Sequence, residues 1–330
     1  MKTKAVVFPE ADKFEVQEIT LPEVGPNDIL VKTLVTAISP GTERWVLRGK
    51  HLGTKFPCIP GYHRIGIIEK CGKEVKNFEE GDVVYGSAGR WEENIHCMFG
   101  AHVGHSVSGS APYEFVSSVK LDKFDLETLA FTILIGVANR GIRFADPKPA
   151  QTMIIIGAGI IGICAAQLAA LKGAALVLLE KDQEKLAFVK NIVPNIFSPE
   201  DEKLEEKLRA AAPGGFDILY DTVGHARTTD RIVQLMRRQG TMLMQAQYFD
   251  REKCAVDLDQ IKIKELTIKT TCGIDSQDRL ETTTNIRNRR LKVAPLITHR
   301  LRATDKQLME GYNLLHTGKP FNLGIVFHWQ

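Results

Sequence analysis

The sequence predicts an α/β fold in which a doubly wound parallel sheet is joined to a second, β-rich domain. A glycine-rich turn lies between an apolar strand and an apolar helix in the middle of the chain, within residues 151–180. From there to residue 246, apolar strands alternate with helices, which is typical of a parallel sheet. Residues 1–124 instead carry short strands separated by turns that contain proline and glycine.

The glycine-rich turn has the spacing of a dinucleotide-binding motif. Residues 153–156 are apolar and too few for a helix, so we expect a buried strand there. Gly157, Gly159 and Gly162 follow as G-x-G-x-x-G, before a helix expected from Ile163 to Lys172. The first glycine permits a tight turn, the second lets a pyrophosphate approach the backbone, and the third lets helix and strand pack closely. The helix N-terminus would supply N–H groups and partial positive charge for the phosphates.

An acidic residue completes this motif. The next apolar strand, 175–179, ends in Glu180, which lies 21 residues after Gly159. A carboxylate at this distance is expected to bind the ribose hydroxyls of the adenosine and to repel a 2′-phosphate, so we expect NAD as the cofactor. Two alternatives are a glycine-rich packing turn and, because residues 153–171 are almost wholly apolar, a transmembrane helix. The glycines, Gln167 and the following strand favour a buried Rossmann unit instead.

Length and composition are those of a two-domain globular protein. The chain has 330 residues, of which 44% are hydrophobic and 25% charged, which is ordinary for a soluble protein. A net charge of +3 gives no reason to expect a nucleic acid or a membrane as partner. The first residues lack the pattern of a signal peptide, and six scattered cysteines suit reduced thiols. We therefore expect a cytoplasmic protein.

The expected elements follow the chain in this order. The strands of the first domain are expected at 4–8, 14–19, 29–37, 65–69 and 82–85. A helical pattern covers 125–145 and is broken by Asp146-Pro147-Lys148-Pro149. Later helices are expected at 182–191, 199–212 and 228–238, and strands at 216–221 and 241–246. The domains would then be residues 1–124 and 125–273, with 274–330 returning to the first domain.

The order of these parts resembles the medium-chain dehydrogenase/reductase superfamily, which includes the zinc-type alcohol dehydrogenases. The segments that match the family are Gly61-Tyr62-His63-Arg64-Ile65-Gly66 at its G-H-E-x-x-G, 81–84, 216–221, 295–299 and 310–312. The resemblance covers essentially the whole chain. It implies a GroES-like catalytic domain at the N-terminus, NAD(P)-dependent alcohol dehydrogenase or reductase activity, and a homodimer. Within the superfamily, residues 39–44, 59–62 and 296–300 look most like the bacteriochlorophyllide a dehydrogenases, which oxidise a hydroxyethyl side chain of a chlorin.

The zinc ligands of the family have no counterpart in the sequence. The resemblance places the three positions of the catalytic zinc at Ser39, Tyr62 and near Thr132, and none offers a thiolate, imidazole or carboxylate. The structural-zinc lobe needs four close cysteines, but Cys97 is the only cysteine between residues 86 and 112. We therefore expect no metal site and zinc-independent chemistry. One cluster leaves alternatives open, as a metal site, a substrate-facing lid or an uninvolved loop: His96, Cys97, His102 and His105.

The resemblance also suggests candidate catalytic residues. Ser39, Tyr62 and His63 come from segments that face the nicotinamide in the family. The ordinary pKa of a histidine is about 6.5, so His63 is the first choice for general acid and base. Tyr62 and Ser39 would hydrogen-bond the reacting oxygen, and Glu43 would orient His63 or Arg64. The alternative is that Tyr62 and His63 only pack between the domains.

Further cofactor contacts are implied by the resemblance alone. They lie at the start of the helix after the glycines, beside the ribose and at the ends of strands. These residues are Ile160, Ile161, Lys185, Thr222, Val223, Gln245, Ala246, Cys272 and Gly273. Asn322 stands where many relatives have an arginine that binds the pyrophosphate.

Together these features favour an NAD(H)-dependent, zinc-independent oxidoreductase that acts on a secondary alcohol or ketone. One alternative is a zinc-free reductase of activated C=C bonds or quinones, and another is a dinucleotide-binding protein without catalysis. The polar trio of serine, tyrosine and histidine favours the alcohol, because enone reduction can proceed in a largely apolar pocket.

Overall fold

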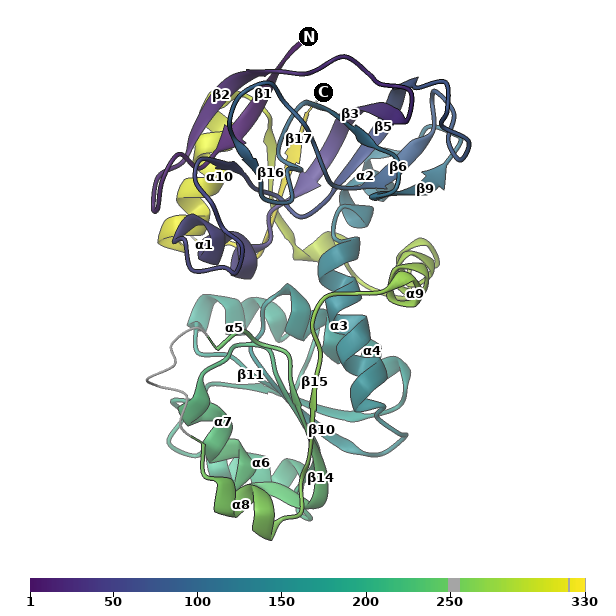
Figure 1. The fold of residues 1–330 in the computed structure, drawn as a ribbon. Helices are drawn as coiled ribbons and strands as arrows, with labels where there is room; N and C mark the ends of the chain where they lie inside the picture. The colour runs from purple at the N-terminus through teal and green to yellow at the C-terminus, as the bar shows by residue number, and fades with distance from the viewer. Residues whose placement is uncertain (249–255, 320, 330) are drawn as a thin grey trace. The chain divides into compact units, whose positions relative to one another are not determined.

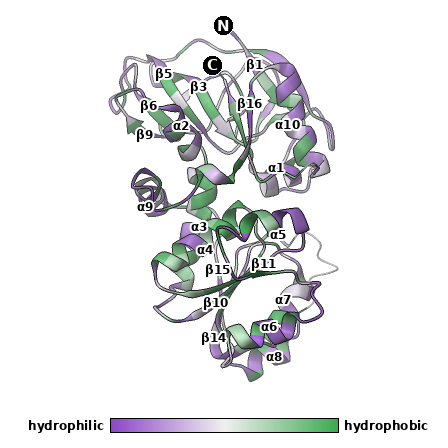
Figure 2. Ribbon diagram, turned by 180° about the vertical axis from the view of Figure 1, so that it is seen from behind, coloured by the Kyte–Doolittle hydropathy of each residue, from purple (hydrophilic) through white to green (hydrophobic). Residues whose placement is uncertain are grey.

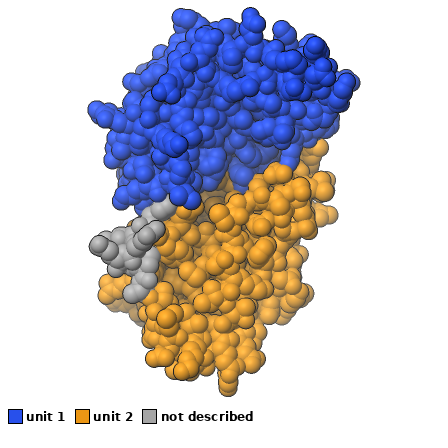
Figure 3. Space-filling view, viewed as in Figure 1, with its two compact units in different colours: residues 1–133, 293–330 blue, residues 134–292 orange. Residues whose placement is uncertain are grey.

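The computed structural model describes residues 1–248, 256–319 and 321–329, and these divide into two compact units (Figure 3). Unit 1 comprises residues 1–133 and 293–330, and unit 2 comprises residues 134–292. From the sequence the boundaries were expected at 124 and 274. Helix α9 (Ser276–Arg287), which the sequence placed in the returning tail, groups with unit 2 because acidic residues at its start pair with arginines of α3 (Thr132–Ala145).

Unit 2 is built on a parallel sheet. In the described part of the chain this sheet has six strands in the order β12-β11-β10-β13-β14-β15, and all its pairings are parallel. The chain winds outwards from β10 in both directions, as in doubly wound folds (Figure 1). The strands are β10 (Thr152–Ile156), β11 (Ala175–Leu179), β12 (Ile196–Phe197), β13 (Phe216–Asp221), β14 (Met236–Met244) and β15 (Thr267–Thr270). This sheet confirms the predicted α/β class.

The unit has helices that pack on its sheet, and the central strand β10 is buried and apolar over residues 153–156 (Figure 2). Besides α3 and α9 they are α4 (Ile160–Leu171), α5 (Gln183–Val189), α6 (Leu204–Ala211), α7 (Ala226–Val233) and α8 (Leu258–Ile263). Leu204 and Leu208 of α6 and Ile232 of α7 share a core with Ile154 of β10 and Leu219 of β13.

Several helical predictions differ from the structure; the helix expected at 199–212, for example, begins at Leu204. The helix expected at 228–238 ends at Val233, and Met236 already belongs to β14. The register of β14 against β13 is irregular after Met236, so residues 237–240 add to a strand that the sequence started at 241. The single helix expected at 125–145 is two helices, α2 (Lys123–Leu129) and α3, separated by a tight turn in which Phe131 N–H donates to Thr128 O at 3.2 Å.

Unit 1 is β-rich, as expected. Its main sheet has seven strands among the described residues, in the order β16-β17-β3-β5-β6-β9 with β8 on β3. Two smaller pairs are β1–β2 and β4–β7. The strands are β1 (Lys2–Val7), β2 (Glu15–Thr20), β3 (Asp28–Ala37), β4 (Cys58–Ile59), β5 (Arg64–Cys71), β6 (Val83–Gly86), β7 (His96–Cys97), β8 (His105–Gly109), β9 (Tyr113–Ser117), β16 (Ile297–Arg302) and β17 (Gly324–His328).

The C-terminal segment completes this unit. Strand β17 pairs with β3 and with β16, so residues from both ends of the chain form one sheet. Helix α10 (Asp305–Thr317) and helix α1 (Pro40–Leu47) pack on a common core that includes Phe8, Leu47 and Tyr312.

The helices were also compared with the requirements of a membrane span. In the described ranges no single helix is long and apolar enough, and only the consecutive helices α2 and α3 taken together pass by length and composition.

Candidate functional site

The three glycines of the turn in unit 2 differ in the space that a side chain would find. Gly157 has a φ of +100°, and an added Cβ there would overlap the side chain of Val223. A Cβ at Gly162 would overlap the carbonyl oxygen of Gly157, so this glycine is needed for close packing of helix and strand. Gly159, by contrast, has nothing within 4 Å of where its Cβ would be. The open side of the turn is therefore at the middle glycine.

This open glycine is also the N-cap of α4. Its lack of a side chain means that no side-chain oxygen caps the first N–H groups of the helix, at Ile160 and Ile161. Uncapped N–H groups at a helix N-terminus bind phosphate oxygens and carry partial positive charge. The turn and helix therefore fit the pyrophosphate of a dinucleotide.

Glu180 lies at the end of β11 and is tied to the glycine-rich turn. Its Oε2 accepts a hydrogen bond from Ala158 N–H at 3.0 Å, and its Oε1 accepts from Lys181 and Asp182 N–H at 2.9 and 3.0 Å. Lys185 Nζ lies 3.4 Å from Oε2. The residue is only 7% exposed, and its carboxylate is held in place by the N–H groups of the turn and by Lys185. A carboxylate has about four acceptor sites, so a ribose hydroxyl would bond Glu180 in place of one of these contacts.

A small pocket of about 150 Å³ opens beside this strand end. Its apolar wall comes from Leu179, Pro199, Leu204 and Ile232, and its polar rim from His225, Arg227, Thr228 and Arg231. Arg231 donates to Pro199 O at 3.0 Å. A flat, partly apolar ring suits this pocket. The three basic residues of the rim lie at the N-cap of α7 and on this helix, and they were not among the expected site residues.

The other residues of unit 2 that were expected to contact the cofactor lie at or after the carboxyl ends of β13, β14 and β15. Thr222 uses its hydroxyl to bond Ile156 O at 2.7 Å, and Val223 is 52% exposed beside it. The side chain of Gln245 is taken up by protein groups, since it bonds the Tyr220 hydroxyl, Val137 O and Thr271 Oγ1. Its neighbour Ala246 is half-buried, and Cys272 is exposed. The backbone N–H of Gln245 is also engaged, since it donates to Asp221 O at 3.1 Å.

In unit 1 the buried carboxylate of Glu43 joins three segments. Its Oε1 accepts from Ser39 N–H at 2.8 Å, and its Oε2 accepts from the Tyr312 hydroxyl at 2.6 Å and lies 3.1 Å from His102 Nε2. His102 Nδ1 lies 2.9 Å from Thr36 Oγ1. These contacts are satisfied when His102 carries its proton on Nε2.

Glu43 therefore does not orient His63 or Arg64, as the sequence analysis expected. Its partners are instead His102 and Tyr312, which are far away in the sequence and which the analysis did not connect with it. Burial raises the pKa of Tyr312 well above its ordinary value, and the nearby Glu43 carboxylate adds to this effect. Tyr312 is thus held as a neutral donor to Glu43.

Two hydroxyl groups meet at the edge of this network. Tyr62 Oη lies 2.9 Å from Thr42 Oγ1, and the Tyr62 ring packs against Phe99 with 4.4 Å between ring centroids. Both residues are half-buried, whereas Ser39 is 3% exposed. The accessible hydroxyls are therefore those of Thr42 and Tyr62. Thr42 was not among the expected residues, because the first zinc position of the family falls on Ser39.

His63 lies next to Tyr62 in sequence but contacts a different residue. Its ring stands edge-on against Tyr85, with 4.6 Å between centroids and 82° between planes. The Tyr85 hydroxyl accepts from Ile133 N–H at 2.6 Å. The next residue, Arg64, is completely buried and donates to Ser106 Oγ, Gly100 O and Ala88 O. Arg64 is thus a structural residue that ties the loop 88–100 to β5 and β8.

The four residues of the histidine and cysteine cluster do not gather at one point. His102 is buried with Glu43, while His105 lies on β8 within 3.4 Å of Glu69. His96 and Cys97 form β7, which pairs with β4. No group of three or more histidine, cysteine, aspartate or glutamate side chains in the described ranges is arranged to hold a metal ion.

The positions expected for a catalytic zinc carry hydroxyl groups. Ser39 is buried at the start of α1, Thr132 Oγ1 donates to Leu129 O at 2.7 Å, and Tyr62 bonds Thr42. Neutral hydroxyls are poor ligands for Zn²⁺, so these residues do not fit the ion. Asn322, where relatives have an arginine, donates to Leu314 O at 3.1 Å within unit 1.

Two family models match the chain in its two parts. The model described as "Alcohol dehydrogenase GroES-like domain" matches residues 25–120, and the model described as "Zinc-binding dehydrogenase" matches residues 161–287. An L-threonine 3-dehydrogenase from Vibrio parahaemolyticus is 25% identical over 340 residues, which cover 95% of this chain and 95% of the relative. These matches extend over both units.

Solved structures share the fold. A zinc-binding dehydrogenase from Sinorhizobium meliloti, bound to NADP, has a TM-score of 0.82 at 21% identity and covers 99% of each chain. An alcohol dehydrogenase from Escherichia coli, in complex with NADH, has a TM-score of 0.82 at 16% identity and also covers 99% of each chain. The combination of a GroES-like domain with a Rossmann-type sheet is thereby confirmed.

Proposed function

Because the chain belongs to the medium-chain dehydrogenase/reductase superfamily of zinc-type alcohol dehydrogenases, we propose that it is an NAD(H)-dependent oxidoreductase that acts on a secondary alcohol or ketone without a catalytic zinc. The observation that carries the proposal is the open Gly159 at the uncapped start of α4, with Glu180 held beside it. Similar proteins were solved with NADP and with NADH.

For the cofactor, the chain's own residues favour NAD over NADP. Glu180 would accept hydrogen bonds from the ribose hydroxyls in place of some of its contacts in the free protein, and its charge would repel a phosphate on the 2′ oxygen. The pocket beside Leu179 would take the adenine ring. Arg227 and Arg231 at the rim of this pocket would attract a 2′-phosphate, and Lys185 partly neutralises Glu180. The preference for NAD depends on the balance between these cations and the Glu180 carboxylate.

For the chemistry, the nicotinamide ring supplies hydride transfer when the dinucleotide is bound. The protein must then hold the reacting oxygen and transfer one proton. The paired hydroxyls of Thr42 and Tyr62 can donate and accept hydrogen bonds, so they suit an alcohol or carbonyl oxygen. His63 is the proposed proton carrier because its ordinary pKa is near the pH at which enzymes work.

Glu43 and Ser39 have supporting roles in this proposal. Glu43 is 1% exposed and cannot reach a substrate, but it fixes Ser39 N–H and His102 and so holds the start of α1. Glu43 is therefore a positioning residue. Ser39 is too buried to contact the substrate with its side chain. The nearby Thr42 would instead hydrogen-bond the reacting oxygen.

Zinc-independent chemistry is proposed from the donor set of this site. With Ser39, Tyr62 and Thr132 at the expected ligand positions, a Lewis acid would have no thiolate or imidazole to hold it. Hydrogen bonds from neutral hydroxyls would take the place of the metal in polarising the substrate oxygen.

The substrate class is proposed from the resemblance of three segments. Residues 39–44, 59–62 and 296–300 resemble the bacteriochlorophyllide a dehydrogenases, so a hydroxyethyl group on a chlorin is the first candidate. From the family we also propose a homodimer located in the cytoplasm.

The proposal is tested by adding NAD⁺ and a panel of chlorin alcohols, polyols and simple secondary alcohols, and following NADH formation by absorbance. Turnover with one class of secondary alcohol is the expected result. Oxidation of NADH by enones or quinones alone would favour the reductase alternative. Tight binding of NADH with no turnover of any compound would favour a protein without catalysis.

A further inference from the structure

Two aspartates at the start of α9 form a reciprocal cap. Asp275 is the N-cap, and its Oδ1 accepts from Asp278 N–H at 2.9 Å. Asp278 Oδ2 in turn accepts from Asp275 N–H at 3.0 Å. This capping box fixes the first turn of the helix and holds both carboxylates on the same side.

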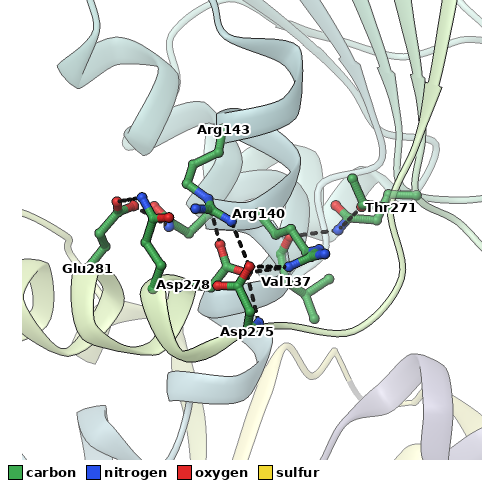
Figure 4. Close-up of polar contacts among 10 residues, drawn as sticks. Val137, Arg140, Arg143, Thr271, Asp275, Asp278 and Glu281 are labelled. Atoms are coloured by element: carbon green, nitrogen blue, oxygen red, sulfur yellow. Dashed lines mark hydrogen bonds and ion pairs between the residues drawn. The ribbon is translucent and has the colours of Figure 1, made fainter.

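Two arginines from the last turns of α3 meet these carboxylates (Figure 4). Arg140 Nη1 lies 2.7 Å from Asp275 Oδ2 and 3.0 Å from Asp278 Oδ2. Arg143 Nη2 lies 2.9 Å from Asp275 Oδ2, and its Nε lies 2.9 Å from Asp278 Oδ1. We call these four residues the α3–α9 clamp. Asp278 is completely buried, so its charge depends on both arginines.

The charges of the clamp are stabilised by these contacts. The Asp278 N–H and the arginine guanidinium groups hold the pKa of the Asp275 carboxyl well below its ordinary value. The pKa of Arg140 is raised, mainly by its hydrogen bond to Asp278. Asp275 and Arg140 therefore stay ionised across the physiological pH range.

A second set of contacts joins segment 271–274 to helix α3, one turn before Arg140. Thr271, just after β15, accepts a hydrogen bond at 2.8 Å from Gln245, which also donates to Val137 O of α3 at 2.6 Å (Figure 4). Ile274 packs over Gly136, where an added Cβ would lie 3.2 Å from Ile274 Cγ2. The segment 271–274 is thus held at its start, at its end and along its side.

Segment 271–274 follows β15, on the side of the sheet away from β11. The nicotinamide would lie on this side if the adenosine lies at β11. The glycine-rich turn follows β10, and Glu180 follows β11 on one side of it. Adenosine therefore belongs to the β11 side of the carboxyl edge. The other half of the dinucleotide must extend over the ends of β13, β14 and β15, where segment 271–274 carries the exposed Cys272 and the open Gly273.

Building on the proposed function, we infer that the α3–α9 clamp is a positioning device that holds segment 271–274 in the shape required by the nicotinamide half of the bound dinucleotide. Its four members are positioning residues and touch neither cofactor nor substrate. Loss of the clamp should weaken the grip on the nicotinamide half and leave the adenosine half bound as before.

The test compares two ligands on the full chain. NADH carries both halves, whereas ADP-ribose carries the adenosine half without nicotinamide. Asp278→Asn removes the buried charge, and Asp275→Ser keeps an oxygen for the cap while removing the ion pairs to Arg140 and Arg143. Glu205→Gln is the matched control, because it breaks an exposed ion pair with Arg209 on α6 of the same unit.

The account predicts that NADH affinity, measured by calorimetry, falls by about tenfold in Asp278→Asn and in Asp275→Ser. ADP-ribose affinity should stay within about twofold of the unmodified protein in both, and Glu205→Gln should change neither. The emission shift of bound NADH should also decrease. Equal loss of both ligands, or no loss of either in a folded Asp275→Ser protein, would overturn the inference. If the unmodified protein binds neither ligand, the proposed function itself is wrong.

Discussion

The hydroxyl oxygens of Thr42 and Tyr62 lie 2.9 Å apart, although Thr42 is on α1 and Tyr62 precedes β5. Each hydroxyl can donate one hydrogen bond and accept others. Beside it, Glu43 holds Ser39 and His102 in place. Thr42 and Tyr62 are half-buried, whereas Ser39 and Glu43 are buried.

The first prediction separates the roles of Tyr62 and His63. Tyr62→Phe removes one hydrogen bond to the reacting oxygen and should lower kcat by about 10²-fold. His63→Gln removes the proton carrier and should lower kcat by roughly 10²–10⁴-fold. Steady-state kinetics with the best alcohol of the panel gives both values.

The control for this pair is the affinity for NADH, which should change little because the dinucleotide motif lies in unit 2. Only His63→Gln should alter the shape of the pH profile of alcohol oxidation, because only this variant removes the proposed proton carrier. Near-normal turnover of His63→Gln, together with an inactive Tyr62→Phe, would reverse the two roles and make Tyr62 the proton carrier.

The second prediction concerns two glycines of one turn. Gly162→Ala would place a Cβ on the carbonyl oxygen of Gly157 and should destabilise the fold by at least about 1–3 kcal/mol. Gly159→Ala meets open space and should leave the free energy of unfolding within about 1 kcal/mol while weakening NADH binding. Denaturant unfolding and calorimetry measure the two effects. A stable Gly162→Ala protein that binds NADH normally would contradict the structure of the turn.

The third prediction concerns cofactor choice. The charge of Glu180 should make NADH bind about ten- to a hundredfold more tightly than NADPH. Glu180→Gln should reduce that ratio, because the amide no longer repels a 2′-phosphate. Arg227→Gln should instead increase the ratio by removing a cation from the rim of the neighbouring pocket. Calorimetric titration that gives equal affinity for both dinucleotides in the unmodified protein would refute the role of Glu180.

The fourth prediction is a loss of stability at mildly acidic pH. Burial lowers the pKa of His105 and of His328 below the ordinary value of 6.5, and the neighbouring glutamates offset this only in part. Near pH 6 the unfolded chain therefore binds more protons than the folded chain, so the free energy of unfolding falls as the pH is lowered through 6.5.

His328→Gln should make this decline shallower between about pH 7 and pH 5, as measured by urea unfolding at a series of pH values. His316→Gln, which changes an exposed histidine on α10, is the control and should leave the slope unchanged. An identical slope in all three proteins would show that His328 does not contribute.

The sequence predicted the features that depend on local spacing. The glycines, the bounds of β11 and β13 and the position of Glu180 follow from residues close in the chain, and the structure has them as expected. The predicted end of α7 was wrong because Met236 belongs to strand β14, which pairs with β13 in an irregular register. Such pairing depends on a neighbouring strand and leaves no local pattern.

The partners of Glu43 show the same limit in the site. His102 and Tyr312 are 59 and 269 residues away, and only the folded sheet of unit 1 brings them to one carboxylate. Similarly, the arginines of α3 and the aspartates of α9 are more than 130 residues apart. A charged residue in a helical pattern is usually solvated, so no local pattern connects these arginines with these aspartates.

The most direct test of the central claim combines metal content with turnover. The protein should be purified without a metal-binding tag, analysed for zinc, and assayed for NAD⁺-dependent alcohol oxidation before and after dialysis against a chelator. The account predicts well under one zinc per chain and unchanged turnover after chelation, because hydroxyl groups occupy the expected ligand positions. About one zinc per chain, removed by the chelator together with the activity, would contradict it.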